Sequence, residues 1–555
     1  MKYIKTLLFF VAVLLLSGCY DDKGGNDYDS VLPDVSISLP ETTYSGVLGD
    51  KISITPSITT NIDASDLQYI WEVCGERFNA QGRKMFVPLV ADSLQGKDLS
   101  YTCKLDSNIT QMDKNYECRL HVRQKSTGRD FYSATTFTIT IEGITGLMVL
   151  YGDDNGCDVG VLKAMEFMPS TSSIPAQLVT TSAIYSMNSG RKMAGEGKSI
   201  VQEKPSYVNS KKKDECRIVV LTSKESQVLN RADLSVYGDW NALFYLQGDR
   251  KVNTGNPKGF FADRSWYAAF DGDDVFITVP SMGVSTYLFP TFTSTTVAGG
   301  HTYTFQPALL DVGTSGIQKL MFVNTVDGKN QKGFVGYTSG SLQNATSHLA
   351  LLDTKTDAVP FNPGDMKATL VKMSLDSRDH VIAVMKGDGD HAVYPNQYFL
   401  VDMLPNASSA GGSGYQGVPQ QEIGMASLTD VDAAQSFEFG KSVNEMYYAT
   451  AKQVYHYGLD GTKLTAARPL QKTGGSTIAF SGTITMMKML NSPNVTTHTT
   501  DEVLLVATWD GSQSHLYALH LDEMTGNVTA LSLYDATTVS GWSFKKIYDV
   551  NIKSL

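Results

Sequence analysis

The segment Val503–Gly526 reads "VLLVATWDGSQSHLYALHLDEMTG" and contains two apolar runs on either side of an Asp-Gly turn. An uninterrupted apolar run such as "VLLVA" is typical of a strand that is packed on both faces. The run after the turn carries more polar residues, which indicates a strand nearer the edge of a sheet. The segment therefore predicts a β-hairpin, and its pattern defines a unit that can be sought elsewhere in the chain.

Runs of the same kind recur along the later part of the chain, about 59 residues apart on average. A unit of this length accommodates four strands with variable loops. We therefore expect an all-β chain with a β-propeller of about seven blades over residues 144–555. Two or more further β-sandwiches would also give closely spaced strands, but no second Pro/Gly-rich linker marks a boundary between them. The runs begin at Gly146, Arg217, Asp274, Lys319, His380, Glu445 and Glu502.

Residues 33–143 carry shorter alternating segments, such as "KISITPSI" and "YECRLHVRQ", which are separated by turn residues. Their number and spacing predict an immunoglobulin-like or PKD-like β-sandwich. Trp71 has the position of a core tryptophan, and Tyr116 and Cys118 have the Tyr-x-Cys spacing of a tyrosine corner.

Five cysteines follow Cys19, and because five is odd they cannot all pair within the chain. Cys74 or Cys103 could pair with Cys118, and the sequence does not choose between these partners. No CxxC pattern occurs, so no zinc site is predicted. The five are Cys74, Cys103, Cys118, Cys157 and Cys216.

The N-terminus has a short positive region followed by an apolar segment that ends in "LSGC" at Cys19. This pattern predicts a bacterial lipoprotein signal peptide over residues 1–18, with lipidation of Cys19. The apolar segment is shorter than the about 20 residues of a membrane-spanning helix. Residues 19–32 are rich in Gly, Asp and Asn, so we expect a flexible tether that carries the lipid.

Asp21 and Asp22 follow the predicted lipid anchor and resemble an acidic signal for export to the outer face of the outer membrane. Acids at this place would also simply solvate a tether. The formal net charge is −11, and removal of Lys2 and Lys5 with the signal peptide makes it −13. Because phosphate binding needs a basic face, the charge excludes nucleic acid as an expected partner.

Motifs of catalysis and metal binding are absent from the sequence, which has neither HExxH nor G-x-S-x-G. No catalytic residue, metal or cofactor is predicted. The acidic segments "FDGDD" at Phe270 and "KGDGDH" at Lys386 offer oxygen ligands for calcium, but Asp-Gly is also common hairpin chemistry. Turns are the favoured interpretation.

Aromatic residues in the repeat region suggest a binding surface, because flat rings bind sugar rings or peptide side chains by burying area at small entropic cost. The alternative is that the same rings fill the space between blades. The candidate ligand-binding residues are Trp240, Trp266, Tyr287, Tyr303 and Trp509.

The head "CYDDKGGNDYD" from Cys19, the segments "YIWEV", "YECRLHV" and "GLMVLY", and the closing "WSFKKIYDVNIK" together resemble the PKD-like family of Bacteroidetes surface lipoproteins. The Gly24–Asn26 spacing departs slightly from the usual head of that family. The resemblance implies an accessory role beside SusC/SusD-type outer-membrane transporters and other surface lipoproteins. It supplies no catalytic residue.

The expected function is therefore a cell-surface binding protein that captures oligosaccharides or peptides for a TonB-dependent uptake complex. One alternative is a propeller-type glycan hydrolase or lyase whose acids converge in the central funnel. Another is a purely structural assembly subunit.

Overall fold

The computed structural model divides into two compact units, residues 1–142 and 143–555. The predicted signal peptide and the tether up to residue 31, with Cys19, lie outside the described residues. The structure describes residues 32–47, 50–89, 96–103, 109, 114–142, 144–168, 178–203, 216–245, 256–262, 267–278, 289–290, 296–298, 301–312, 319–337, 349–352, 360–407, 415–459, 467–492 and 502–553.

The first unit is built of antiparallel strands with one parallel pair, β2 on β10. The largest sheet has the order β2-β10-β8-β5-β6, with β9 also on β8, and two further pairs join β1 to β4 and β3 to β7. The strands are β1 (Val35–Ser38), β2 (Thr43–Val47), β3 (Lys51–Ile54), β4 (Ser57–Thr60), β5 (Leu67–Phe78), β6 (Lys84–Pro88), β7 (Leu99–Thr102), β8 (Asn115–Gln124), β9 (Asp130–Tyr132) and β10 (Phe137–Glu142).

The core of this unit forms where the alternating apolar positions of its strands meet. Trp71 on β5 is buried, its ring meets Phe137 edge to face at 5.8 Å, and its indole N–H donates to the Gly96 carbonyl. Leu120 and Val122 on β8 belong to the same cluster. Trp71 therefore has the core position that its sequence context predicted.

The five described cysteines are all buried, and no disulfide joins any of them. The optional pairing of Cys118 with Cys74 or Cys103 is therefore not formed. Burial raises the pKa of the Cys118 and Cys157 thiols, because the interior disfavours the thiolate. Both side chains act as small apolar groups in the core.

In the second unit, successive antiparallel sheets follow one another along the chain. Their first strands are β40 (Lys546–Lys553), β14 (Gly197–Gln202), β19 (Pro257–Ala262), β24 (His301–Asp311), β28 (Ala368–Leu375), β32 (Ser436–Gly440) and β36 (Thr483–Asn491). Their second strands are β11 (Gly146–Asp153), β15 (Arg217–Thr222), β20 (Tyr267–Asp271), β25 (Lys319–Val326), β29 (Val381–Gly387), β33 (Glu445–Ala449) and β37 (Glu502–Trp509).

The third strands of these sheets are β12 (Gly156–Lys163), β16 (Ser226–Asn230), β21 (Asp274–Thr278), β26 (Gly333–Tyr337), β30 (Tyr398–Ala407), β34 (Val454–Gly458) and β38 (Ser514–Leu521). Six sheets have a fourth strand in the described residues: β13 (Leu178–Thr181), β17 (Val236–Asp239), β27 (Leu349–Leu351), β31 (Tyr415–Gly424), β35 (Arg468–Pro469) and β39 (Val528–Tyr534). In addition, β23 (Thr296–Ala298) pairs with β24, and β18 (Phe244–Tyr245) pairs with β22 (Phe289–Pro290).

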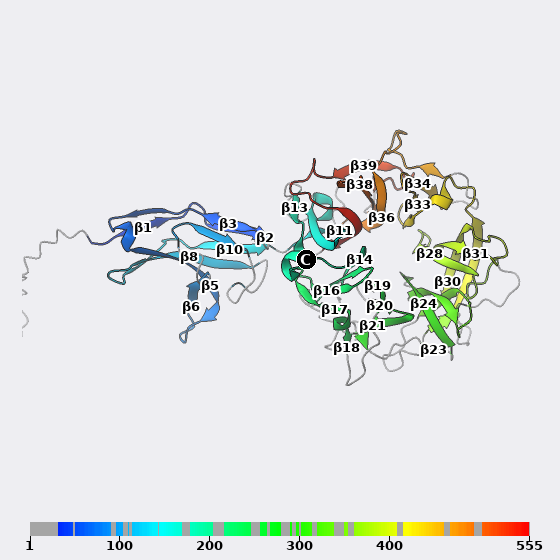
Figure 1. Ribbon diagram of the computed structural model, residues 1–555, viewed down its shortest axis with the longest axis horizontal. Helices are drawn as coiled ribbons and strands as arrows, with labels where there is room; N and C mark the ends of the chain where they lie inside the picture. The colour runs from blue at the N-terminus through cyan, green and yellow to red at the C-terminus, as the bar shows by residue number, and fades with distance from the viewer. Residues whose placement is uncertain are drawn as a thin grey trace, which may run out of the picture. The chain divides into compact units, whose positions relative to one another are not determined.

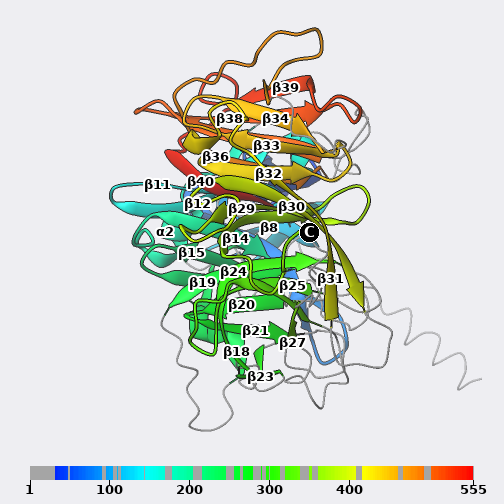
Figure 2. The same ribbon diagram turned by 90° about the vertical axis from the view of Figure 1, so that its right-hand side faces the viewer.

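The first strands of neighbouring sheets contact one another in a closed cycle, β40-β14-β19-β24-β28-β32-β36 and back to β40. Figure 1 shows the sheets of this unit following one another around that cycle, from cyan β11 through green and yellow to red β39. The cycle closes because β40, late in the chain, pairs antiparallel with β11, which opens the unit. The all-β class is confirmed, and the short α2 (Ile184–Ser189) beside β12 is the α-helix of the described chain (Figure 2).

Asp549 on β40 connects the strands at the point where the cycle of first strands closes. One of its carboxylate oxygens accepts from the Ile200 backbone N–H on β14 at 2.9 Å. The other accepts from Lys488 Nζ on β36 at 2.7 Å. One buried carboxylate therefore bonds to the first strands on both sides of its own.

First and second strands differ in burial. Seven of the eight residues of β37 are buried, whereas β14 and β19 alternate buried with partly exposed positions. Six of the seven predicted apolar runs are second strands, and the run at Asp274 is the third strand β21. An apolar run therefore marks the strand covered on both faces, as expected from its composition.

Candidate ligand-binding cavity

The aromatic residues predicted to bind ligand have different surroundings. Trp266 and Tyr287 lie outside the described residues. Tyr303 on β24 is only 2% exposed and packs on Phe305 at 6.0 Å, so its ring faces are covered by the protein core. Trp509 ends β37 and is half-buried.

Trp240 lies at a cavity of about 320 Å³. The cavity is bounded by the turn between β15 and β16 (222–227), by the start of η4 (Trp240–Leu243) and by Asn256 and Pro257 at β19. Lys198 on β14 completes the lining. The cavity therefore lies at a corner between the sheet of β14–β17 and the sheet of β19–β21.

Trp240 lines this cavity, and its indole N–H is an unusual group. Trp240 is only 3% exposed, and its Nε1 has no hydrogen-bond partner among the described residues. Its ring contacts Phe244 at 5.8 Å, within the core cluster that includes Leu243. A buried donor without an acceptor costs free energy unless something else supplies the acceptor. The site is therefore suited to a ligand that presents an oxygen.

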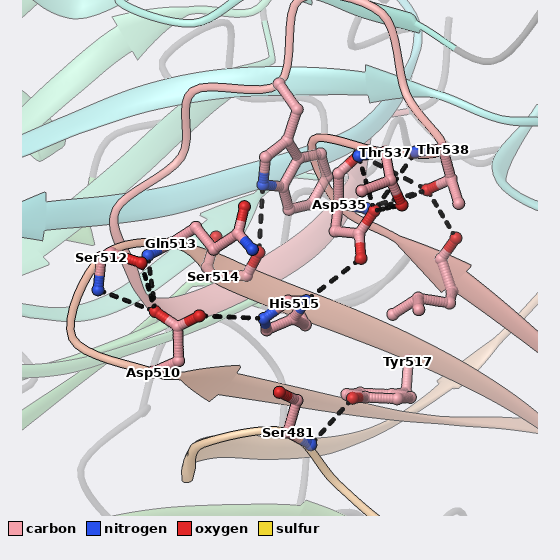
Figure 3. Close-up of polar contacts among 12 residues, drawn as sticks. Ser481, Asp510, Ser512, Gln513, Ser514, His515, Tyr517, Asp535, Thr537 and Thr538 are labelled. Carbon is pink, nitrogen blue, oxygen red and sulfur yellow. Dashed lines mark hydrogen bonds and ion pairs between the residues drawn. The ribbon is translucent and has the colours of Figure 1, made fainter.

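The equivalent corner after β39 also carries a tryptophan, but there the indole N–H has a hydrogen-bond acceptor within the protein. We call it the sealed corner. Trp542 follows the fourth strand β39 as Trp240 follows the fourth strand β17, and its Nε1 donates to the Ser514 carbonyl at 3.1 Å. Ser514 begins the third strand β38, as Ser226 begins β16. Figure 3 shows Ser514 and its neighbours at this corner. The two corners share a layout and differ in the partner of the tryptophan.

His515 completes the polar network of the sealed corner (Figure 3). Its Nδ1 lies 3.1 Å from the Asp535 carboxylate and its Nε2 lies 3.4 Å from that of Asp510. Hydrogen bonds from the Ser512 and Gln513 backbone hold the pKa of Asp510 well below its usual range. This network is a structural clamp, since its groups bond to each other.

The charged groups at the Trp240 cavity are unevenly paired. The Glu225 carboxylate accepts two bonds from the Arg191 guanidinium, at 2.8 and 3.0 Å. Asp239 accepts from the backbone of Asn241 at 3.0 Å. Lys198 and Lys224 also line the cavity, and no described carboxylate lies within 4.0 Å of either ammonium group.

The acidic segments that offered calcium ligands behave as turns where they are described. Asp271 and Asp274 face each other across the β20–β21 hairpin, and Gly272 between them has a positive φ of 60°. No group of three or more metal-binding side chains gathers within the described residues. The turn interpretation of "FDGDD" agrees with this geometry.

The geometry defines an all-β protein of two units, with a polar cavity at a corner between two sheets. Residues 19–197 match the model of the PKD-like family, so the resemblance predicted from the sequence is confirmed over this part of the chain. The match runs past the first unit to the start of β14. Within the described part of the chain, no helix is long and apolar enough to span a bilayer.

No curated protein matches the sequence. An auxiliary nutrient binding protein from Bacteroides ovatus aligns with a TM-score of 0.27 at 7% identity, covering 94% of this chain and 90% of that one. A eukaryotic initiation factor aligns with a TM-score of 0.27 at 10% identity, covering 88% and 98%. TM-scores this low carry no argument about either fold or function.

Proposed function

We propose that this chain is an outer-membrane lipoprotein, anchored through Cys19, that faces the cell exterior and serves as an accessory nutrient-binding subunit. It captures oligosaccharides or peptides beside a SusC/SusD-type TonB-dependent transporter. Along the chain, the tether of residues 19–32 is followed by the PKD/Ig-like sandwich of residues 33–143 and by a β-propeller of about seven blades, residues 144–555. The closed cycle of first strands supports the propeller, and the "LSGC" segment that ends at Cys19 and the PKD-like match support the surface lipoprotein.

The observation that carries the binding role is the Trp240 cavity. Trp240, whose buried N–H has no partner among the described residues, lines a hollow whose other lining residues are mostly polar. Cavities of this size with a few convergent polar groups are the usual form of small-ligand sites. Trp240 then acts through its N–H rather than through the open ring face that its sequence context suggested.

A non-catalytic role is favoured over the hydrolase or lyase by the carboxylates of the described first strands. Glycoside hydrolysis needs two carboxyl groups facing each other across the substrate. The described first strands carry three carboxylates, and each is held by a lysine. The pairs are Asp311 with Lys319, Glu438 with Lys372, and Asp549 with Lys488.

Purification of the chain from its native outer membrane in mild detergent tests this proposal. A SusC-type TonB-dependent transporter and its SusD-type lipoprotein should co-purify with the intact chain. The Cys19→Ala variant, which cannot be lipidated, should be released from the membrane and lose both companions. A solitary protein carrying an intact lipid would contradict the accessory role.

A further inference from the structure

We propose that the Trp240 cavity binds a sugar residue that carries a carboxylate, such as a hexuronate at the end of an acidic oligosaccharide. This inference rests on the proposed binding function and specifies its ligand. The juxtaposition that carries it is a tryptophan with a buried, unpartnered N–H in the same cavity lining as two lysines that have no described acidic partner.

The donors at the cavity outnumber the available charged acceptors. The Trp240 N–H and the ammonium groups of Lys198 and Lys224 can all donate, and none of them can accept. Glu225 is already held by both terminal nitrogens of Arg191. Asp239 is the remaining carboxylate in the lining, so the unpaired charge at the cavity is positive.

An anionic ligand oxygen would accept a hydrogen bond from the Trp240 N–H and would also balance the positive charge of the two lysines. Hydrogen bonds between a charged and a neutral group are stronger than neutral pairs, and more so where water is excluded. Trp240 is buried, so its N–H would donate in a low-dielectric setting. The exposed lysines would contribute attraction that weakens with salt.

The remaining lining favours a sugar over an acidic peptide. Ser223, Asn241 and Asn256 offer hydroxyl and amide groups, which pair with the hydroxyl groups of a sugar ring. The volume of about 320 Å³ lies near the lower end of the range for small-molecule sites, which suits one ring rather than a long segment.

The chain contains matched controls for Lys224 and for Trp240. Lys224 sits in a turn in which the Thr222 hydroxyl accepts from the backbone N–H groups of residues 224 and 225. Lys452 sits in the corresponding turn between β33 and β34, where the Thr450 hydroxyl accepts in the same way. Trp542 is the matching control for Trp240.

Binding of trigalacturonate and of the neutral galactotriose to the full-length lipoprotein in detergent, measured by calorimetry, tests the inference. Trigalacturonate should bind at least about 10-fold more tightly than galactotriose. Lys198→Met and Lys224→Met should each weaken trigalacturonate binding several-fold and shrink the preference for the acid. Trp240→Phe, which keeps a ring but removes the donor, should weaken it about 10-fold or more.

The controls should separate this site from general charge or stability effects. Lys452→Met and Trp542→Phe should leave trigalacturonate affinity unchanged. Equal binding of both trisaccharides, with a loss only in Trp240→Phe, would overturn the acidic ligand and leave the binding role intact. Tighter binding of triglutamate than of trigalacturonate would overturn the sugar class. An absence of binding by either trisaccharide would overturn the inference, while co-purification with the transporter would still test the accessory role separately.

Discussion

Trp240 and Trp542 occupy corresponding places after the fourth strands of two sheets, and their indole groups have different partners. Trp542 donates to a carbonyl oxygen, whereas Trp240 has no described acceptor. The sequence drew attention to Trp240 as an exposed ring surface, but the structure buries that ring in a core cluster. The relevant atom is one nitrogen, and no local sequence pattern reports whether a buried N–H is paired.

Replacement of Trp240 and of Trp542 by phenylalanine should show, without any ligand, that only the Trp542 N–H is hydrogen-bonded. Both variants lose similar volume, but only Trp542→Phe loses a hydrogen bond and leaves the Ser514 carbonyl without that donor. We expect Trp542→Phe to be less stable than Trp240→Phe by about 1 kcal/mol or more, measured by urea unfolding. A larger loss in Trp240→Phe would mean that its N–H is satisfied in the free protein.

Glu422 on β31 gives the second unit a pH-dependent stability. Burial raises the pKa of Glu422 to about 7, because the interior disfavours its charged form. The Nε2 atom of the buried His391 lies 3.3 Å from a carboxylate oxygen of Glu422. Burial lowers the pKa of His391, so its imidazole is neutral and gives the carboxylate little compensating charge. A carboxyl whose pKa is raised on folding contributes its full stability below its unfolded pKa, and that stability is lost as the pH rises through about 7.

Glu422→Gln should therefore resemble the parent protein near pH 5 and exceed it in stability near pH 8, by up to about 3 kcal/mol. Thermal melting at the two pH values measures the change. Glu523→Gln, at an exposed position, should show no such dependence. A Glu422→Gln effect of the same size at both pH values would contradict the assignment.

At the scale of elements, apolar runs located the sheets of the second unit but not their first strands. Second strands are covered on both faces and read as continuous apolar segments. First strands such as β14 keep polar residues at partly exposed positions, so their pattern is weak. The closing segment "WSFKKIYDVNIK" is distinguished only by its resemblance to the PKD-like family, since the pairing of β40 with β11 leaves no pattern in nearby sequence.

Asp549 should matter more than other paired acids of the first strands. It bonds to β14 and β36 at once, whereas Glu438 on β32 forms an ion pair with Lys372 on β28. Removal of a buried carboxylate leaves its hydrogen-bond donors without an acceptor. We expect Asp549→Ala to destabilise the second unit by about 2 to 4 kcal/mol in urea unfolding, and Glu438→Ala by clearly less. Equal losses would show that the closure has no special dependence on this residue.

At the scale of the whole molecule, the all-β class was accessible from the sequence, and the ligand cavity was not. Periodic apolar runs reflect burial, which composition records directly. The cavity forms where three loops and one strand edge meet, and its character depends on which charges are already paired. Glu225 and Asp239 look alike in sequence, but only Glu225 is held by Arg191.

The second unit should fail to form without its closing strand. A chain ending at Ser543 retains every complete sheet except that of β11, which loses its pairing with β40. We expect this truncation to abolish cooperative unfolding of the second unit while the sandwich remains folded. Circular dichroism and limited proteolysis would show it, and a chain ending at Lys553 serves as the control. A protease-resistant second unit in the shorter chain would contradict the importance of the closure.

The pairing of β11 with β40 also sets the order of events during biogenesis. Lys553 bonds to the carbonyl of Ile144, 409 residues earlier in the chain. A growing polypeptide therefore contains the strands of six further sheets before β40, the partner of one edge of β11, is synthesised. Until β40 is made, this edge of β11 offers unpaired backbone groups to other chains, which favours misassembly of incomplete chains.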